Sequence, residues 1–316
     1  MYPIDCSLKR KYLSLTSKNV RLDEDISWLI GFYFAEGTKS KNLIGFANSD
    51  LPLVNKALRI FTFIGLGYKD WRCYIHTNNL DETSIKRFNE HYPGIRVDLS
   101  YSKLATKETL DFRINSRALS LFVNDYFYQC MQKILLDKSL SRSFLQGYSV
   151  GDGCVVLRNK QIHSFVITIK KREYLDYLVT ICTLLYGKNP NIRMTKECYE
   201  LSYCNVNIIT KIILDNIFID LDRQWSKLIR GYRNKQYTRS RVKYWDKIEV
   251  QPLDVLKIAE LSGNSHWSVR DAMNRDVSLG LVKSEYKHIN NRFHSCKCYS
   301  LTEEGRALLS LIKEVK

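Results

Sequence analysis

Residues 27–38 read Ser27-Trp-Leu-Ile-Gly-Phe-Tyr-Phe-Ala-Glu-Gly-Thr38, and a related stretch occurs further along the chain. At a constant offset of 116 residues they align without gaps with Ser143-Phe-Leu-Gln-Gly-Tyr-Ser-Val-Gly-Asp-Gly-Cys154. A serine, a leucine and two glycines are identical, and each copy places a carboxylate before its second glycine. Such self-similarity indicates that one structural unit occurs twice, so the duplicated stretch is expected to organise the fold.

Each copy is typical of a helix whose C-terminus is marked by Gly37 or Gly153. Small residues recur four positions apart in both copies, at 31 and 35 and at 147 and 151. Residues at this spacing share one helix face, and small side chains there let two backbones approach closely. We therefore predict that the two helices pack against each other through these faces.

This packing would bring Glu36 and Asp152 together at the C-terminal ends of the two helices. The helix dipole is negative there and like charges repel, so both carboxylates would be unfavourably placed. A divalent cation removes both objections because hard cations bind carboxylate oxygens. A pair of solvated carboxylates is the alternative, but its occurrence in both copies argues for a metal site.

The elements that follow each copy predict an α+β chain with two repeats, at 20–130 and 136–222. Both are expected to share the order αββαββα, and the first has an extra helix and strand at 84–92 and 95–100. The other expected strands are 43–48, 72–76, 109–114, 164–170, 191–195 and 199–203. The other expected helices begin near 51 or span 118–128, 173–186 and 206–217.

Charge favours a polyanionic partner. The 316 residues include 49 Lys+Arg against 33 Asp+Glu, a formal net charge of +16. No apolar run approaches the roughly 18 residues of a membrane span, so we expect no membrane association. Nine scattered cysteines suit reduced thiols, and we expect a cytoplasmic protein of a prokaryotic cell or an organelle matrix. The charge of a folded basic chain suits either nucleic acid or an anionic membrane face, and of these we expect nucleic acid.

About half of the net charge lies in residues 223–243, which contain eight basic residues and no acidic one. Aromatic residues are interleaved with these cations, which suits phosphates and bases. We expect 223–245 to be a basic linker, with simple solvation of the linker as the alternative to phosphate contact.

The paired motifs resemble those of the LAGLIDADG homing endonucleases of the monomeric two-motif type, over residues 20–218. The resemblance implies two pseudo-symmetric repeats with saddle-shaped antiparallel sheets and the motif helices at their interface. It also implies that Glu36 and Asp152 bind divalent metal, usually Mg²⁺, with the carbonyls of Ala35 and Gly151 close by. Lys39 and Lys170 are candidates for polarising water, or for simple phosphate contacts.

In this family the sheets lie in the DNA major groove, where each base pair shows a distinct pattern of donors and acceptors. Polar side chains on one strand face would then read bases, and the basic segment would contact phosphates. The candidate DNA-binding residues in the two repeats and the basic segment are Arg72, Tyr74, His76, Arg113, Asn115, Lys171, Arg193, Arg230, Arg233, Lys235 and Arg239.

Residues 246–316 resemble a winged helix-turn-helix domain, with helices expected at 253–261 and 267–279 and a last helix after Thr302. Arg270 and Arg275 would then lie on the recognition helix. The segment carries eleven basic and ten acidic residues, so charge gives little support to DNA binding there. A protein-interaction role is the alternative.

Together these features predict a monomeric, magnesium-dependent endonuclease that cuts both strands of a long asymmetric DNA target. The chain's ends lack intein splice features, so we expect a free-standing or intron-encoded protein. A DNA-binding regulator built on a retired endonuclease core is the first alternative, although regulators of that type tend to lose the metal carboxylates. An RNA maturase is the second alternative, since no residue selects DNA over RNA.

Overall fold

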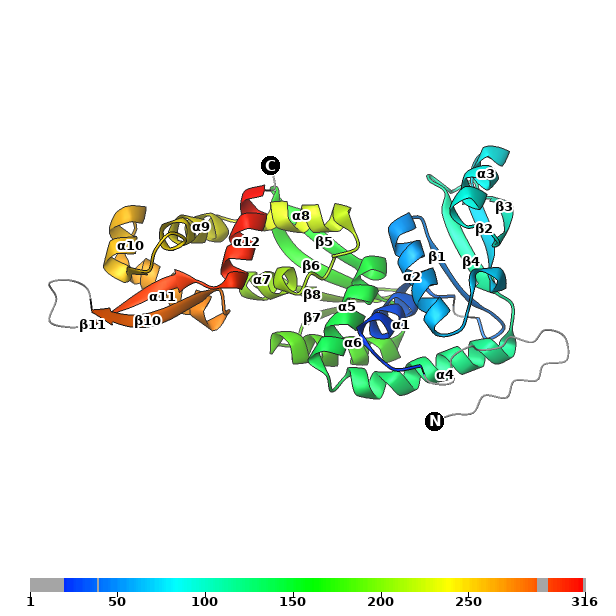
Figure 1. The fold of residues 1–316 in the computed structure, drawn as a ribbon, viewed down its shortest axis with the longest axis horizontal. Coiled ribbons are helices and arrows are strands. Elements are labelled where there is room, and N and C mark those ends of the chain that lie inside the picture. The colour runs from blue at the N-terminus through cyan, green and yellow to red at the C-terminus, as the bar shows by residue number, and fades with distance from the viewer. Residues whose placement is uncertain (1–19, 39, 289–294, 315–316) are drawn as a thin grey trace. The chain divides into compact units, whose positions relative to one another are not determined.

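The computed structural model describes residues 20–38, 40–288 and 295–314 of an α+β chain (Figure 1). The chain divides into two compact units. The first comprises residues up to 153 together with 167–201 and 217–221, and the second comprises 154–166, 202–216 and 222–316. Over the described ranges, no helix is both long and apolar enough to cross a membrane.

The duplicated stretches form helices α1 (Glu24–Glu36) and α5 (Lys138–Asp152), which pack against each other as predicted (Figure 1). An aspartate begins each helix, because the side chain of Asp23 accepts from a backbone N–H of the first turn of α1 and Asp137 does the same for α5. The two helices lie at the centre of the first unit, and residues 26–34 of α1 are all buried.

Two glycines set the distance between these helices. A Cβ atom on Gly31 would overlap the carbonyl oxygen of Phe144 and lie 2.9 Å from the backbone nitrogen of Tyr148. A Cβ on Gly147 would overlap the carbonyl oxygen of Trp28 and lie 2.9 Å from the nitrogen of Phe32. The two contacts exchange under the 116-residue offset, so each copy packs on the other through equivalent atoms.

The glycines mark the helix C-termini as predicted, and neither has the left-handed conformation common at such positions. Gly37 has φ −67° and ψ 144°, and Gly153 has φ −89° and ψ 145°, so both are extended. A Cβ on either residue would instead overlap the carbonyl oxygen four residues earlier, of Tyr33 or of Ser149. Close approach, rather than positive φ, therefore requires glycine at these positions.

The first sheet has the strand order β1-β4-β2-β3 and is mixed rather than purely antiparallel. Helix α3 connects β2 to β3 as a crossover, which makes these two strands parallel. The elements are β1 (Ile44–Asn48), α2 (Leu51–Phe63), the 3-10 turn η1 (Tyr68–Asp70), β2 (Arg72–Thr77), α3 (Glu82–His91), β3 (Arg96–Tyr101), β4 (Thr109–Ile114) and α4 (Arg117–Ile134).

Between α1 and α2 only one strand forms, so the first repeat departs from the order αββαββα. The missing strand is reduced to an isolated bridge between Gly37 and Phe46, supported by a hydrogen bond from the Thr38 nitrogen to the Gly45 carbonyl. The chain turns back toward β1 within a few residues of the end of α1, which leaves no length for a full strand.

The second repeat has the complete order αββαββα. After α5 come β5 (Gly153–Arg158), β6 (Gln161–Ile169), α6 (Arg172–Tyr186), β7 (Asn191–Met194), β8 (Tyr199–Tyr203) and α7 (Val206–Leu214), and the sheet order is β5-β6-β8-β7. The predicted order implies a strand at the place of β5, but the bounds of β5 were not predicted. It turns into β6 through Asn159 and Lys160, whose φ values of 50° and 62° form a two-residue hairpin turn without a glycine.

Segment 223–245 is not a linker, which corrects the expectation from its charge. It forms most of two helices, α8 (Asp222–Arg233) and α9 (Gln236–Ile248). Each is amphipathic and buries an apolar face, including Leu228 and Ile229 on α8 and Trp245 on α9. A run of cations concealed this pattern because all the lysines and arginines of the segment except Arg241 lie outside the buried positions of the helical period.

One cation of this segment is structural. Arg241 is 1% exposed and pairs with Asp276, which is 0% exposed and also accepts a 2.7 Å hydrogen bond from Trp245 Nε1. The Arg241 guanidinium also donates to the Tyr232 hydroxyl at 3.3 Å, and this hydroxyl lies 2.7 Å from Thr210 Oγ1. Burial raises the pKa of the Asp276 carboxyl, which the adjacent guanidinium opposes. The network joins α7, α8, α9 and α11.

The last part of the chain has a helix-turn-helix followed by a β-hairpin and a final helix. The elements are β9 (Leu253–Asp254), α10 (Val255–Ser262), α11 (His266–Ser278), β10 (Val282–His288), β11 (Ser295–Leu301) and α12 (Glu303–Glu314), with strand order β10-β11-β9. Gly263 has φ 68° and ends α10 in the left-handed conformation, which lets the chain turn into α11.

Substitution Gly147→Ala tests the backbone contact between α1 and α5. We expect it to reduce the free energy of unfolding by about 3 kcal/mol or more, since the added methyl group overlaps main-chain atoms that cannot move aside. Gly67→Ala is the control, because its nearest neighbour, Asp70 Oδ2, lies 3.7 Å away and its φ is −77°. Equal effects of both substitutions in urea unfolding would contradict the close-contact explanation.

Substitution Asp276→Asn tests the buried ion pair. It leaves the Arg241 charge without its counterion in the core, and we expect it to cost about 3–5 kcal/mol in urea unfolding. Glu260→Gln removes one partner of the exposed pair with Lys257 and should leave stability almost unchanged. A small loss for Asp276→Asn would mean that water reaches the pair.

Candidate functional site

The candidate site lies where α1 and α5 end side by side. A Cβ built on Gly151 would lie 2.7 Å from Ala35 Cβ, 2.9 Å from Glu36 Cγ and 3.3 Å from Glu36 Oε1. The carboxylate of Glu36 therefore lies against the last turn of α5, next to the residue that precedes Asp152. The structure thus brings Ala35 and Glu36 of one motif against Gly151 of the other, and Asp152 is the next residue of α5.

A hydrogen bond orients the first acid, and a buried tyrosine lies within the electrostatic influence of the second. Asn48, the last residue of β1, donates from Nδ2 to Glu36 Oε1 at 3.2 Å. On the other helix, Tyr148 is buried, and its burial and then the charge of Asp152 raise the pKa of its hydroxyl. This hydroxyl donates to the Thr168 carbonyl at 3.4 Å, so it remains protonated beside Asp152.

The donor set fits a hard divalent cation. Carboxylates supply oxygen ligands, and the last carbonyls of a helix lack the intrahelical partners that earlier carbonyls have. Over residues 20–38, 40–288 and 295–314, no group of three or more His, Cys, Asp and Glu side chains could hold a metal ion. Two carboxylates alone do not fill the six coordination positions of Mg²⁺, which usually keeps several waters and also binds substrate phosphates.

The candidate lysines differ in their surroundings. Lys39 lies outside the described residues, and Lys170 is exposed just beyond the end of β6. Lys171, which precedes α6, places Nζ 3.3 Å from Glu173 Oε1 and 3.4 Å from the Tyr174 hydroxyl. Burial would lower the pKa of Lys171, but Tyr174 and Glu173 raise it above its ordinary value.

Lys171 is thereby connected to the motif helix, which sequence reasoning did not detect. The ring of Tyr174 stacks on Phe34 of α1, with centroids 4.5 Å apart and planes at 13°. Phe34 lies two residues before Glu36, in the last turn of α1. The ammonium group of Lys171 contacts Tyr174, and Tyr174 in turn contacts this turn. In the sequence, the only indication of this role was the position of Lys171 between the expected strand 164–170 and the expected helix 173–186.

The strand-face prediction for β2 agrees with the burial pattern. Arg72, Tyr74 and His76 are half-buried on one face and alternate with the buried residues Cys73, Ile75 and Thr77. Arg113 lies directly opposite Arg72 on β4. Asn115 is exposed just after β4, and Arg193 is exposed on β7.

Acidic residues on the same face pair with these cations, and no sequence pattern indicated them. Arg72 Nε donates to Asp98 Oδ2 at 2.7 Å, and Arg113 donates to both carboxylate oxygens of Asp111. His76 Nε2 lies 3.2 Å from Asp111 Oδ2. The hydrogen bond from Arg72 lowers the pKa of Asp98, and the carboxylates raise the pKa of both arginines.

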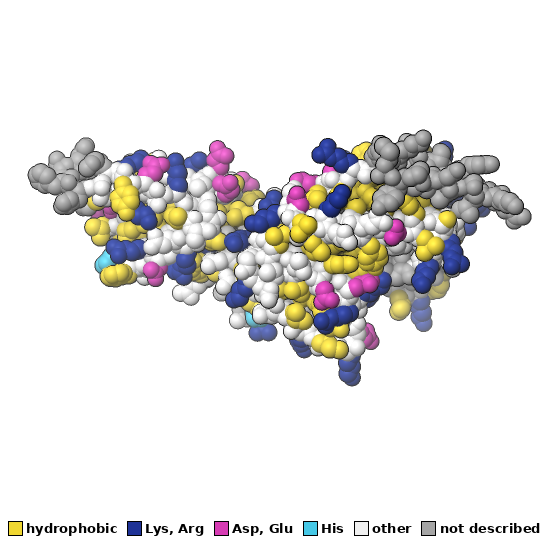
Figure 2. All heavy atoms as spheres, turned by 90° about the horizontal axis from the view of Figure 1, so that it is seen from below, with side chains coloured by type: hydrophobic (Ala, Val, Ile, Leu, Met, Phe, Trp, Pro, Cys, Tyr) yellow, Lys and Arg dark blue, Asp and Glu magenta, His cyan; other side chains and the backbone are white. Residues whose placement is uncertain are grey.

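The other basic candidates lie on helix surfaces. Arg230, Arg233 and Arg239 are exposed on α8 and α9, and Lys235 is half-buried at the start of α9. Lys and Arg side chains on the face shown in Figure 2 are dispersed rather than gathered in a single patch.

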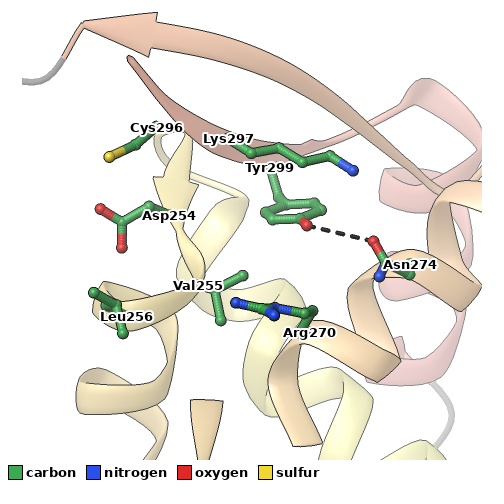
Figure 3. A pocket seen from close by; sticks show the side chains of 8 residues that line it. All are labelled: Asp254, Val255, Leu256, Arg270, Asn274, Cys296, Lys297 and Tyr299. Atoms are coloured by element: carbon green, nitrogen blue, oxygen red, sulfur yellow. Dashed lines mark hydrogen bonds between the residues drawn. The ribbon is translucent and has the colours of Figure 1, made fainter. Parts of the chain in front are cut away.

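Helix α11 carries the two predicted arginines of the last segment. Arg270 lies 5.0 Å from the ring centroid of the exposed Trp267, and Arg275 lies 5.3 Å from that of Tyr237. An open pocket of about 300 Å³ adjoins α11 and β11 (Figure 3). It is lined by Asp254, Val255, Leu256, Arg270, Asn274, Cys296, Lys297 and Tyr299.

No family model matches the chain. One curated protein is similar in sequence, the DNA-directed RNA polymerase subunit Rpo1C of Methanocaldococcus jannaschii, with 25% identity over 164 residues. That alignment covers 50% of this chain but spans only 15% of the polymerase subunit. The similarity therefore concerns a fraction of the subunit.

Solved structures with some likeness include the N-terminal LAGLIDADG domain of DUF199/WhiA and several homing endonucleases. Full-length DUF199/WhiA from Thermatoga maritima is 12% identical with a TM-score of 0.40, covering 83% of this chain and 93% of that one. The homing endonuclease I-WcaI bound to its DNA recognition sequence is 14% identical with a TM-score of 0.41, covering 64% and 85%. I-DmoI in complex with DNA and Ca is 16% identical with a TM-score of 0.36, covering 60% and 87%. Likenesses this distant carry no inference about this chain.

The free energy of unfolding of the metal-free protein tests whether the two acids contribute to folding or are placed there for function. Neutralising either acid removes a charge from the negative end of a helix dipole, so Glu36→Gln and Asp152→Asn should each stabilise the metal-free chain by about 0.3–1 kcal/mol. Glu24→Gln at the first turn of α1 is the matched control and should slightly destabilise it. Urea unfolding in EDTA measures all three. A clear loss of stability in both acid variants would indicate structural carboxylates.

Proposed function

We propose that this protein is a metal-dependent endonuclease that cuts duplex DNA, in the manner of a two-motif LAGLIDADG homing endonuclease. The observation that carries the proposal is the position of Glu36 against Gly151, where α1 and α5 end together. Two acids at the C-terminal ends of packed helices reduce the stability of the fold, because they face the negative ends of the helix dipoles and repel each other. The same arrangement favours binding of a divalent cation. The formal net charge of +16 supports a polyanionic substrate.

Mg²⁺ is the proposed cofactor, and bound metal ions would neutralise the scissile phosphate and activate water for hydrolysis. Glu36 and Asp152 would hold it, with the carbonyls of Ala35 and Gly151 adjacent. Asn48 orients the Glu36 carboxylate through its amide hydrogen bond. The ammonium of Lys171 is anchored on Tyr174 and Glu173 and would attract a phosphate near the second repeat.

The substrate would be a long asymmetric duplex, because the two repeats are not copies of each other. Only the first repeat contains the additional helix α3 and the parallel strand β3. The arginines of α8 and α9 would add phosphate contacts, and the segment from β9 to α12 would act as a winged helix-turn-helix domain. We propose that one chain suffices, that it acts in the cytoplasm or an organelle matrix, and that it serves intron homing.

A DNA-binding regulator is the second candidate. The observation that favours it is the absence, among the described residues, of a third acidic or histidine ligand near the two acids. Such a protein would bind duplex DNA through the same surfaces without cutting it.

Cleavage assays with the full chain distinguish the two candidates. Duplexes recovered by binding selection from a random library in EDTA would be cloned into plasmids and incubated with the protein and Mg²⁺. We expect double-strand cleavage that EDTA abolishes, and loss of about 100-fold or more in rate for Glu36→Gln or Asp152→Asn because both acids hold the metal. Glu24→Gln, in the first turn of α1 and at the opposite end of that helix from Glu36, is the matched control and should leave the cleavage rate nearly unchanged.

Two outcomes would contradict the proposal. Tight duplex binding without cleavage in Mg²⁺ or Mn²⁺ would support the regulator, and unchanged cleavage by both acid variants would place the catalytic centre elsewhere.

A further inference from the structure

The polar face of the first sheet carries an ordered array of five side chains. Along one row Arg72 of β2 lies opposite Arg113 of β4, and along the next row Tyr74 lies between Asp98 of β3 and Asp111 of β4. Alternation along the strands places all five side chains on the same face, away from the aromatic core that includes Phe46 and Phe112.

Both arginines lean from their row onto the tyrosine. The guanidinium carbon of Arg72 lies 5.0 Å from the Tyr74 ring centroid, and that of Arg113 lies 4.9 Å from it. Asp98 and Asp111 belong to the strands on either side of β2, so the two guanidiniums have their carboxylate partners on opposite sides of that strand. Each is thus fixed by a carboxylate on one side and an aromatic ring on the other.

The carboxylates leave the distal edges of both guanidiniums available. Asp98 binds Nε of Arg72, and among the described residues neither terminal nitrogen of Arg72 has a protein partner. Asp111 binds the edge formed by Nε and Nη2 of Arg113, which leaves Nη1 without a protein partner in the described chain. Each arginine side chain is 36% exposed, so this edge reaches the surface.

Electrostatics favour a neutral acceptor over a phosphate at these positions. A carboxylate at hydrogen-bond distance cancels most of the attraction between a guanidinium and an anion, and it also repels the anion directly. Directional N–H donors are unaffected by this cancellation. The major-groove edge of guanine presents two neutral acceptors, O6 and N7, that match the fork of an arginine.

We propose that Arg72 and Arg113 read two guanines in the major groove, with Asp98, Asp111 and Tyr74 as the residues that position them. This inference rests on the proposed DNA-directed function and names part of its substrate. The two guanidinium carbons lie at most about 10 Å apart through the ring, and stacked base pairs are about 3.4 Å apart. The two guanines therefore lie within about three base-pair steps of each other.

Binding-site selection tests the proposal with the full chain and a random duplex library in EDTA, which prevents metal-dependent cleavage. The wild-type chain should enrich sites that contain such a pair of guanines. Arg72→Gln and Arg113→Gln should each lose the preference at one guanine, by about 10- to 100-fold. The slope of log affinity against log salt should stay nearly constant, since these arginines release few counterions.

Two further variants separate positioning from general charge effects. Asp98→Asn should lower the preference for one guanine while making the salt slope steeper, because it releases the charge of Arg72 towards phosphates. Arg230→Gln on the exposed face of α8 is the control for a phosphate contact. It should weaken binding to all sequences equally and reduce the salt slope by about 1.

The possible results are distinct. Retained guanine preferences in Arg72→Gln and Arg113→Gln, with folding verified by circular dichroism, would overturn the base-reading inference alone. A salt slope reduced by about 1 in each of them, without loss of preference, would make these arginines phosphate contacts and also overturn it. Failure of the wild-type chain to bind any duplex would overturn the DNA-directed function and the inference with it.

Discussion

The backbone contact between α1 and α5 at Gly31 and Gly147 is the constraint on which the rest of the structure depends. Each glycine faces a carbonyl oxygen of the other helix, so the two main chains touch without intervening side chains. This proximity also brings the C-terminal ends of the two helices close to each other. Because Glu36 and Asp152 occupy those ends, the same contact that packs the first unit also sets the geometry of the candidate site.

The contact places two acids at the negative ends of two helix dipoles, a position that folding alone would avoid. Elsewhere in the chain, arginine side chains are positioned by the acidic residues with which they form ion pairs. Arg72 and Arg113 are paired with acids that fix their orientation, whereas Arg241 is buried with Asp276 and supports the packing of α9 and α11. Net positive charge therefore does not distinguish arginines that stabilise the fold from arginines that are available to a ligand.

Repetition made the central features predictable from the sequence. The glycine spacing in both copies predicted the packing of α1 and α5, which places Glu36 against Gly151, the neighbour of Asp152. Periodicity located strands such as β4 and β8 at their observed bounds. The bounds of strand β5 were missed because its turn, at Asn159 and Lys160, has positive φ without glycine. The acidic partners Asp98 and Asp111 depend on strand register, and the parallel pairing of β2 with β3 cannot be read from local pattern.

The most direct test of the account is a crystal structure of the full chain bound to a selected duplex in the presence of Ca²⁺, with anomalous diffraction used to locate the ion. We expect anomalous density about 2.3–2.6 Å from carboxylate oxygens of both Glu36 and Asp152, and also beside a phosphate of the duplex. Density bound to neither acid, or a duplex seated away from the ends of α1 and α5, would contradict the central claim.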